Sequence, residues 1–279
     1  MIYYYEIIFA SLLWGTSGVF VKYLNMPAES LAFIRLSIPV VVLSLWFVYT
    51  KNNCFQRHSV TLYAISLINA LRIYLYLLAY SLTTIGNAIV ALYTWPIFMF
   101  ILGVIFLKEK MTCVRAFLIM MAFSGLLLIY GRQEFDWNDN DVIGISVMLV
   151  AAFLSALMMI LLKTEHQVNG VESVFFQNLL GSVIFFPLFL SVDLPSVQQV
   201  SIASVYAFLI GVVAFSLFLN GLRQVQASTA SVITYIEAVS GITFGVVFFN
   251  EQLTWNLVLG AVLILGACVG LVYQYEQPS

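Results

Sequence analysis

The chain has 279 residues, of which 62% are hydrophobic and only 9% are charged. Soluble domains have roughly 45–50% apolar and about 25% charged residues, so this composition excludes an ordinary soluble domain and indicates a membrane protein. A formal net charge of −2 provides no basic field for nucleic acid. Cys54, Cys113 and Cys268 lie far apart without a CxxC pair, so neither a disulfide framework nor a metal site is expected.

In chain order, the apolar runs predict ten transmembrane helices. A bilayer core about 30 Å thick requires about 20 apolar residues per helix. The first run has no Lys or Arg before it, so it is interpreted as a retained span and not as a secretion signal. Several runs are apolar on every side, which favours helices over barrel strands and predicts an all-α membrane protein. The predicted spans are residues 5–23, 29–49, 60–82, 86–107, 113–130, 142–162, 172–192, 201–222, 227–249 and 255–273.

The basic residues predict how the chain is oriented. With the N-terminus in the cytoplasm, Lys22 and Arg132 face outward, and Arg35 and Arg72 lie within spans. The other seven of the 11 basic residues then fall on the cytoplasmic side: Lys51, Arg57, Lys108, Lys110, Arg115, Lys163 and Arg223. The positive-inside rule therefore predicts that both termini are cytoplasmic.

The sequence contains an internal repeat. Shifting the chain by 142 residues aligns residues 84–112 with residues 226–254, with eight identities in 29 positions. The identical pairs are Ala88–Ala230, Val90–Val232, Tyr93–Tyr235, Gly103–Gly245, Val104–Val246, Phe106–Phe248, Glu109–Glu251 and Thr112–Thr254. Each half then holds five spans, and because five is odd, the second half enters the membrane with the opposite orientation. Inverted repeats are typical of secondary transporters, which bind substrate near the midplane where the halves meet.

On these features the chain resembles the drug/metabolite transporter superfamily, in its EamA-type branch. The resemblance covers nearly the whole chain and rests on Trp14-Gly15, Phe33-x-Arg35, the stretch from Ala88 to Glu109 with Pro96, and the stretch from Ala227 to Glu251 with Glu237. It implies two five-helix EamA repeats, here residues 1–137 and 138–279, a location in the bacterial inner membrane, and export of amino acids or related metabolites. The chain departs from the family pattern at Ala238, where a proline is common, and at Asn178, which replaces the second-half arginine.

Three ionisable residues, Arg35, Arg72 and Glu237, lie well inside predicted spans, away from the span ends. An ionised residue at a helix centre costs about 2.5–3.5 kcal/mol on insertion scales, so each should face a cavity or a partner. Asn69, Arg72 and Tyr76 have the spacing i, i+3 and i+7, which places them on one helix face. We expect that face to line a cavity.

Pro96 lies at the centre of the fourth span and predicts a kink there. The repeat alignment pairs Tyr93 with Tyr235 and Trp95 with Glu237. The two copies should therefore face each other across a pseudo-twofold axis and form an aromatic pocket with one acid. The predicted substrate-binding residues are Trp14, Asn69, Arg72, Tyr76, Tyr93, Trp95, Tyr235 and Glu237.

Structural roles compete with this interpretation. Arg72 and Glu237 could pair with each other, or with Asn178 and Asn220, and the aromatic residues could simply pack or form an interfacial belt. Thr112 and Thr254 could cap the helices that follow them. The close-packing spacings Gly241-xxx-Gly245 and Gly266-xxx-Gly270 favour internal contacts over a dimer face, although a second copy of the chain is a candidate partner.

The leading functional hypothesis is an alternating-access carrier of small organic solutes, most often amino acids or related metabolites, with efflux favoured. Arg72 can bind a carboxylate and Glu237 an ammonium, and Glu237 is also a candidate for carrying a coupling proton. Import of a scavenged nucleoside-like or methyl-donor compound, and a receptor or scaffold without flux, are the alternatives. An enzyme is disfavoured because the spans hold no nucleophile with its base, no paired acids and no metal set, and no cofactor is expected.

Overall fold

The computed structural model describes residues 2–24, 26–51, 60–83, 85–110, 112–130, 139–165, 169–249 and 254–276. Within these ranges the regular structure is helical, with no strand. Seven segments of the described chain are long and apolar enough to cross a membrane, and Cys113–Ile129 and Trp255–Leu271 are shorter apolar helices. The chain is therefore an all-α membrane protein.

All ten predicted spans correspond to one helix or to consecutive helices. The first half comprises α1 (Ile2–Gly15), α2 (Ser17–Leu24), α3 (Ala28–Thr50), α4 (Val60–Leu82), α5 (Ile85–Leu92), α6 (Trp95–Leu107) and α7 (Cys113–Tyr130). The second half comprises α8 (Asp139–Thr164), α9 (Gly170–Leu190), α10 (Val197–Ala207), the π-helix η2 (Phe208–Ala214), α11 (Phe215–Gln224), α12 (Ala227–Ile233), α13 (Ile236–Phe249) and α14 (Trp255–Glu276).

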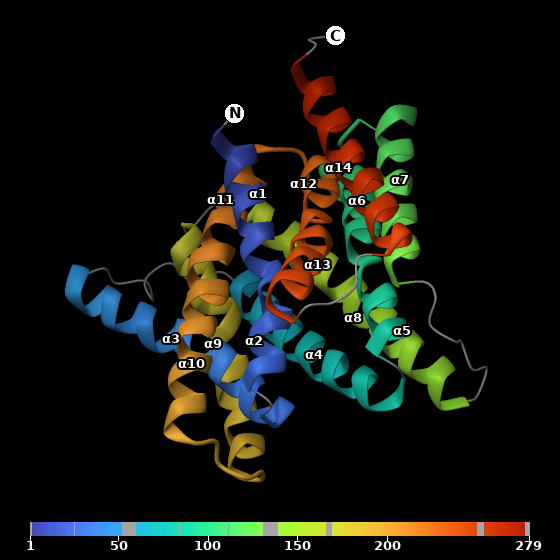
Figure 1. The fold of residues 1–279 in the computed structure, drawn as a ribbon. Coiled ribbons are helices and arrows are strands. Elements are labelled where there is room, and N and C mark those ends of the chain that lie inside the picture. Colours follow the sequence, from blue (N-terminus) through green and yellow to red (C-terminus); the bar gives the residue numbers. More distant parts are fainter. Residues whose placement is uncertain are drawn as a thin grey trace.

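The helices pack in pairs that reflect the repeat. The third span, α4, packs against α8, which begins the second half, and the equivalent α11 packs against α1. The equivalent spans α3 and α9 pack together, as do α7 and α14. Both termini lie at the same end of the molecule (Figure 1). These contacts are those of two inverted five-helix repeats; the predicted boundary between residues 137 and 138 lies outside the described residues.

Both copies of the fourth repeat span are broken near the middle. The first is interrupted at Tyr93 and Thr94, just before Pro96, which confirms the predicted break. The second is interrupted at Thr234 and Tyr235, although Ala238 replaces the proline there. Discontinuous helices at equivalent positions of two repeats are the feature that transporters use to build midplane sites.

Glycines allow α7 and α14 to approach each other closely. A Cβ added at Gly125 would lie 2.6 Å from the carbonyl oxygen of Gly260, and one added at Gly260 would lie 2.5 Å from that of Gly125. A Cβ added at Gly270 would lie 3.1 Å from a Leu118 methyl group of α7. Small residues at helix contacts let backbones meet in lipid, where apolar burial provides no drive for association. The Gly266-xxx-Gly270 spacing thus belongs to an internal contact, as predicted.

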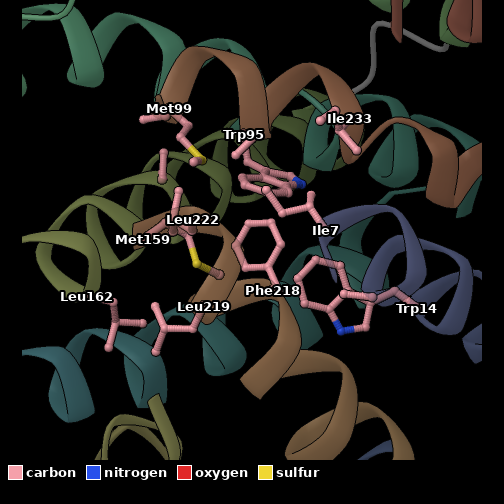
Figure 2. Close-up of a cluster of buried hydrophobic side chains, with 14 of the residues drawn as sticks. Ile7, Trp14, Trp95, Met99, Met159, Leu162, Phe218, Leu219, Leu222 and Ile233 are labelled. Atoms are coloured by element: carbon pink, nitrogen blue, oxygen red, sulfur yellow. The ribbon is translucent and has the colours of Figure 1, made fainter. Parts of the chain in front are cut away.

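The largest apolar core lies between the two halves. Trp14 of α1 packs on Phe218 of α11, with 4.9 Å between ring centroids. Figure 2 shows Trp95 of α6 and Ile7 of α1 beside the same phenylalanine. Trp14 and Trp95 are buried, with 9% and 8% of their surface exposed. These tryptophans join the two repeats through apolar contact.

Candidate functional site

Asn69 and Arg72 interact one turn apart on α4, as their spacing predicts. The Nε and Nη2 atoms of Arg72 donate hydrogen bonds to Oδ1 of Asn69, at 3.2 and 2.8 Å. Nδ2 of Asn69 donates to the backbone oxygen of Gln177 on α9, at 2.8 Å. The amide of Asn69 therefore fixes the guanidinium of Arg72 relative to a helix of the other repeat.

Arg35 lies on α3, where its backbone faces the π-helix η2 of the second half. Pro39 lies four residues further along α3 and has no N–H to donate to the carbonyl of Arg35. That carbonyl faces Gly211 of the π-helix η2, where an added Cβ would lie 3.6 Å from the oxygen and 2.7 Å from Cγ of Pro39. π-Helical segments inside α-helical spans frequently mark functional sites. The side chains of Tyr206, Tyr76 and Glu237 lie near the guanidinium of Arg35.

Glu237 is in the first turn of α13, directly after the helix break. The hydroxyl of Tyr93 hydrogen-bonds to its carboxylate. The hydroxyl of Tyr235 in turn donates to the backbone oxygen of Tyr93 at 2.9 Å, and the two rings are stacked with 6.3 Å between centroids. A Cβ added at Gly15 of α1 would lie 2.8 Å from the carbonyl oxygen of Glu237, so this glycine lets α1 approach the acid closely.

The stacked tyrosines bring the two repeats together as the alignment predicts. Tyr93 and Tyr235 are equivalent positions, 142 residues apart. Each lies at the break of its span, and together they place Glu237 of one repeat on a hydroxyl of the other. The acid and its tyrosine partner therefore form a direct link across the pseudo-twofold axis.

The site contains more positive than negative charge. Arg35 and Arg72 repel each other electrostatically, and Tyr76 interacts with both. Within the described parts of the chain, no carboxylate lies within 4.0 Å of either guanidinium. The alternative in which Arg72 pairs with Glu237 is therefore absent from this structure, and Glu237 interacts with Arg35 instead.

The other structural roles that the sequence suggested have different outcomes in the structure. Asn178 donates to the carbonyl of Val174 in its own helix, at 2.8 Å, and not to Arg72 or Glu237. Thr112 accepts a hydrogen bond from the backbone of Arg115 at 3.3 Å, so it caps α7 as predicted. Trp14 and Trp95 pack in the apolar core described above. The polar constellation thus contains six of the eight predicted residues: Asn69, Arg72, Tyr76, Tyr93, Tyr235 and Glu237.

Three residues of this constellation are additional to the predicted binding set. Arg35 was expected to need a partner because of its charge, and the structure gives it a position beside Glu237. Gln177 is a polar residue in an apolar span, a signal that could have identified it; its side-chain oxygen is buried with no hydrogen-bond partner among the described residues. Tyr206 is one of 15 tyrosines, and nothing in the sequence distinguishes it.

A second polar cluster lies at the end of α6, away from the constellation. Glu109 accepts hydrogen bonds from the backbone N–H groups of Ala227 and Ser228, at 2.6 and 3.1 Å, and from the Ser228 hydroxyl at 3.0 Å. Nζ of Lys163 lies 3.6 Å from the same carboxylate and donates to the carbonyl of Val225. A carboxylate at a helix N-terminus satisfies amides that lipid cannot. Glu109 of the first repeat therefore caps α12 of the second.

Comparison with known proteins identifies the family. The profile of the EamA-like transporter family matches residues 1–131 and 142–273. The chain belongs to the EamA-like transporter family. A crystal structure superposes on this EamA-like transporter with a TM-score of 0.85 at 17% identity and covers 98% of both chains, a likeness that shows the fold alone.

Several curated relatives match this EamA-like transporter over nearly its whole length. "Uncharacterized transporter YoaV" of Bacillus subtilis (strain 168) is 28% identical over 278 residues, covering 95% of this chain and 94% of the relative. The "S-adenosylmethionine uptake transporter" of Rickettsia bellii (strain RML369-C) is 22% identical, covering 94% and 90%. "Solute carrier family 35 member G1" of Mus musculus is 21% identical, covering 94% and 76%. The family and these relatives are transporters and not enzymes, so the chain is a multi-pass membrane transporter.

Proposed function

We propose that this transporter moves small organic solutes, most often amino acids or related metabolites, by alternating access, with efflux as the favoured direction. The supporting observation is the state of Arg72: Asn69 holds its guanidinium, yet no described carboxylate pairs with it. A buried charge in a membrane protein needs a counter-charge. A guanidinium can provide it to a substrate carboxylate through two parallel hydrogen bonds.

The binding site in this proposal consists of Asn69, Arg72, Tyr76, Tyr93, Tyr235 and Glu237, with Trp14 and Trp95 as its apolar surroundings. Arg72 binds the substrate carboxylate, and Glu237 faces the ammonium. The site draws on both repeats, because Tyr235 bonds to Tyr93 across the axis. A rearrangement of one repeat against the other would therefore change the site itself, which is what alternating access requires.

Uptake by purified protein in liposomes tests the proposal. Radiolabelled amino acids are offered to wild-type protein and to the Arg72→Ala and Glu237→Ala variants. We expect the wild type to transport at least one compound and each variant to transport it at least tenfold more slowly. Absence of transport for every compound by folded wild-type protein would contradict the substrate proposal.

Glu237 is also proposed to carry the coupling proton. Tyr93 hydrogen-bonds to its carboxylate, and Arg35 interacts with it from beyond ion-pair distance. Glu237→Gln should abolish accumulation driven by a pH gradient and retain solute exchange. Accumulation that continues in this variant would exclude Glu237 as the proton carrier.

Import is the second candidate. One relative is named an S-adenosylmethionine uptake transporter. Transport measured from each face, in right-side-out and inside-out vesicles, distinguishes import from efflux. Substrate binding without flux in the same vesicles would instead indicate a receptor.

We place the protein in the inner membrane with both termini in the cytoplasm. The positive-inside distribution supports this orientation, and both termini lie at the same end of the molecule (Figure 1). Reagents that label a cysteine introduced at each terminus should reach both only from the cytoplasmic side. Labelling of either terminus from outside would contradict the orientation.

A further inference from the structure

The balance of charge in the polar constellation defines the substrate more narrowly than the proposed function, on which this inference rests. Two guanidiniums, Arg35 and Arg72, are each partly buried in membrane-spanning helices. Glu237 is the acid that interacts with Arg35, and no described carboxylate forms an ion pair with either arginine. The constellation therefore holds an excess of one positive charge even when Glu237 is ionised.

A zwitterion leaves that excess in place, since its own charges cancel. A cation adds to it. A solute with a net charge of −1 removes it, because one carboxylate can meet Arg72 and a second can meet Arg35. Opposite charges in a medium of low dielectric interact strongly, and unpaired like charges are correspondingly unfavourable. The net charge of the substrate is thus the property to which this arrangement is most sensitive.

Two acceptors in the same region require the substrate to donate hydrogen bonds as well. The side-chain oxygen of Gln177 is buried without a partner among the described residues, and the backbone of Gln177 already binds Asn69. The carboxylate of Glu237 accepts from Tyr93 and retains further lone pairs. A purely anionic solute would leave these acceptors unsatisfied, whereas an ammonium group supplies three donors.

We propose that the substrate is a small amino acid with two carboxylates and one ammonium group, such as aspartate or glutamate. Arg35 and Arg72 bind the two carboxylates, and Glu237 with Gln177 accepts from the ammonium. The charge balance also separates this transporter from a carrier of S-adenosylmethionine, whose sulfonium, ammonium and carboxylate groups give a net positive charge.

Counterflow exchange in liposomes with two isosteric pairs tests this proposal. Glutamine has an amide NH2 group where glutamate has a carboxylate oxygen, so the two have nearly the same shape but differ by one unit of charge. Asparagine differs from aspartate in the same way. We expect the wild-type protein to exchange the acid of at least one pair at least tenfold faster than its amide. Lysine and S-adenosylmethionine complete the charge series and should not be exchanged.

Variants of Arg72 show whether the arginine sets this preference. Arg72→Gln removes the excess charge and should reduce the ratio of acid to amide exchange at least tenfold. Arg72→Lys retains the charge and should keep the acid preferred even if the rate falls. Arg115→Gln is the control. It removes a positive charge in the first turn of α7, where Arg115 donates to the carbonyl of Lys110, and it should leave the ratio unchanged.

The outcomes separate the two proposals. Exchange of neutral or cationic amino acids at least as fast as the acids would overturn the charge inference and leave the carrier function standing. An acid preference that persists unchanged in Arg72→Gln and in the equivalent Arg35→Gln variant would also overturn it. No exchange of any compound by monodisperse protein would contradict the proposed amino acid carrier, and this inference with it.

Discussion

Asn69 sets the orientation of the Arg72 guanidinium. Its Oδ1 accepts from two nitrogens of the guanidinium, and its Nδ2 is bound to the backbone of Gln177. Because two of the five guanidinium N–H groups are used, the remaining groups keep a defined direction. Asn69 is therefore a positioning residue in the proposed site.

Replacing Asn69 by Ala should weaken substrate binding more than it changes the maximal rate. We expect KM for the exchanged solute to rise roughly tenfold, equivalent to about 1.4 kcal/mol, because the guanidinium loses its fixed orientation. Ser66→Ala is the matched control, since the Ser66 hydroxyl accepts from the backbone of Leu180 at the same α4–α9 contact. Equal increases in KM for both variants would show that Asn69 acts through the packing of α4 on α9 and does not orient Arg72.

The contacts on α4 could be predicted because they are local. The i, i+3 spacing of Asn69 and Arg72 places them together whatever the tertiary fold. The partner of Glu237 could not be predicted in the same way, because α3, α4 and α13 come from distant parts of the chain. The sequence suggested Arg72 as one possible partner of Glu237, whereas in the fold Arg35 is the arginine that interacts with the acid, from beyond ion-pair distance.

At the scale of the helices, the two broken spans show that a proline can mark a helix break but is not required for one. Pro96 predicts the break before α6, but α12 and α13 are separated without a proline. The second break follows from the fold, in which Tyr235 bonds to Tyr93 and α1 packs on α13 through Gly15. The repeat alignment paired Tyr235 with Tyr93, but a break at Tyr235 was not predicted from the sequence.

The contact between α7 and α14 depends on the absence of two side chains. Gly125→Ala would place a methyl group 2.6 Å from the Gly260 carbonyl, so the helices must separate. We expect a loss of about 1–3 kcal/mol and a Tm lower by several degrees, measured by thermal unfolding in detergent. Gly266→Ala should be tolerated, because its Cβ would lie 3.6 Å from the Met121 methyl group, an ordinary contact. Similar Tm values for both variants would show that this close approach is not required.

The cap that Glu109 places on α12 should restrict access to that end of the helix. Glu109→Gln removes the charge from three hydrogen bonds and from the Lys163 pair. In a variant without native cysteines, Thr229→Cys, which replaces a side chain only 2% exposed, should then react about tenfold faster with a water-soluble maleimide. Asp193→Asn, a change at an exposed acid, serves as the control. An unchanged reaction rate after Glu109→Gln would mean that the Glu109 cap does not limit local unfolding at the N-terminal end of α12.

For the molecule as a whole, the sequence was sufficient to predict the all-α architecture with its two repeats. Long apolar runs determine helices because lipid leaves the backbone no other partner, and an odd number of spans per repeat determines the inversion. Glu109 illustrates the limit: its repeat partner Glu251 was visible in the sequence, but its contact with α12 depends on how the halves pack. The all-α membrane fold with its two repeats and the EamA-like family are established, and alternating access is the proposal that the next experiment tests.

Accessibility of the site from both faces tests that claim most directly. Tyr76→Cys in a cysteine-free background places a thiol beside both arginines. We predict that a membrane-impermeant thiol reagent modifies this cysteine in right-side-out vesicles and, separately, in inside-out vesicles, and that transported substrate slows both reactions. Modification from one face only, under every condition of substrate and pH gradient, would contradict alternating access at this site.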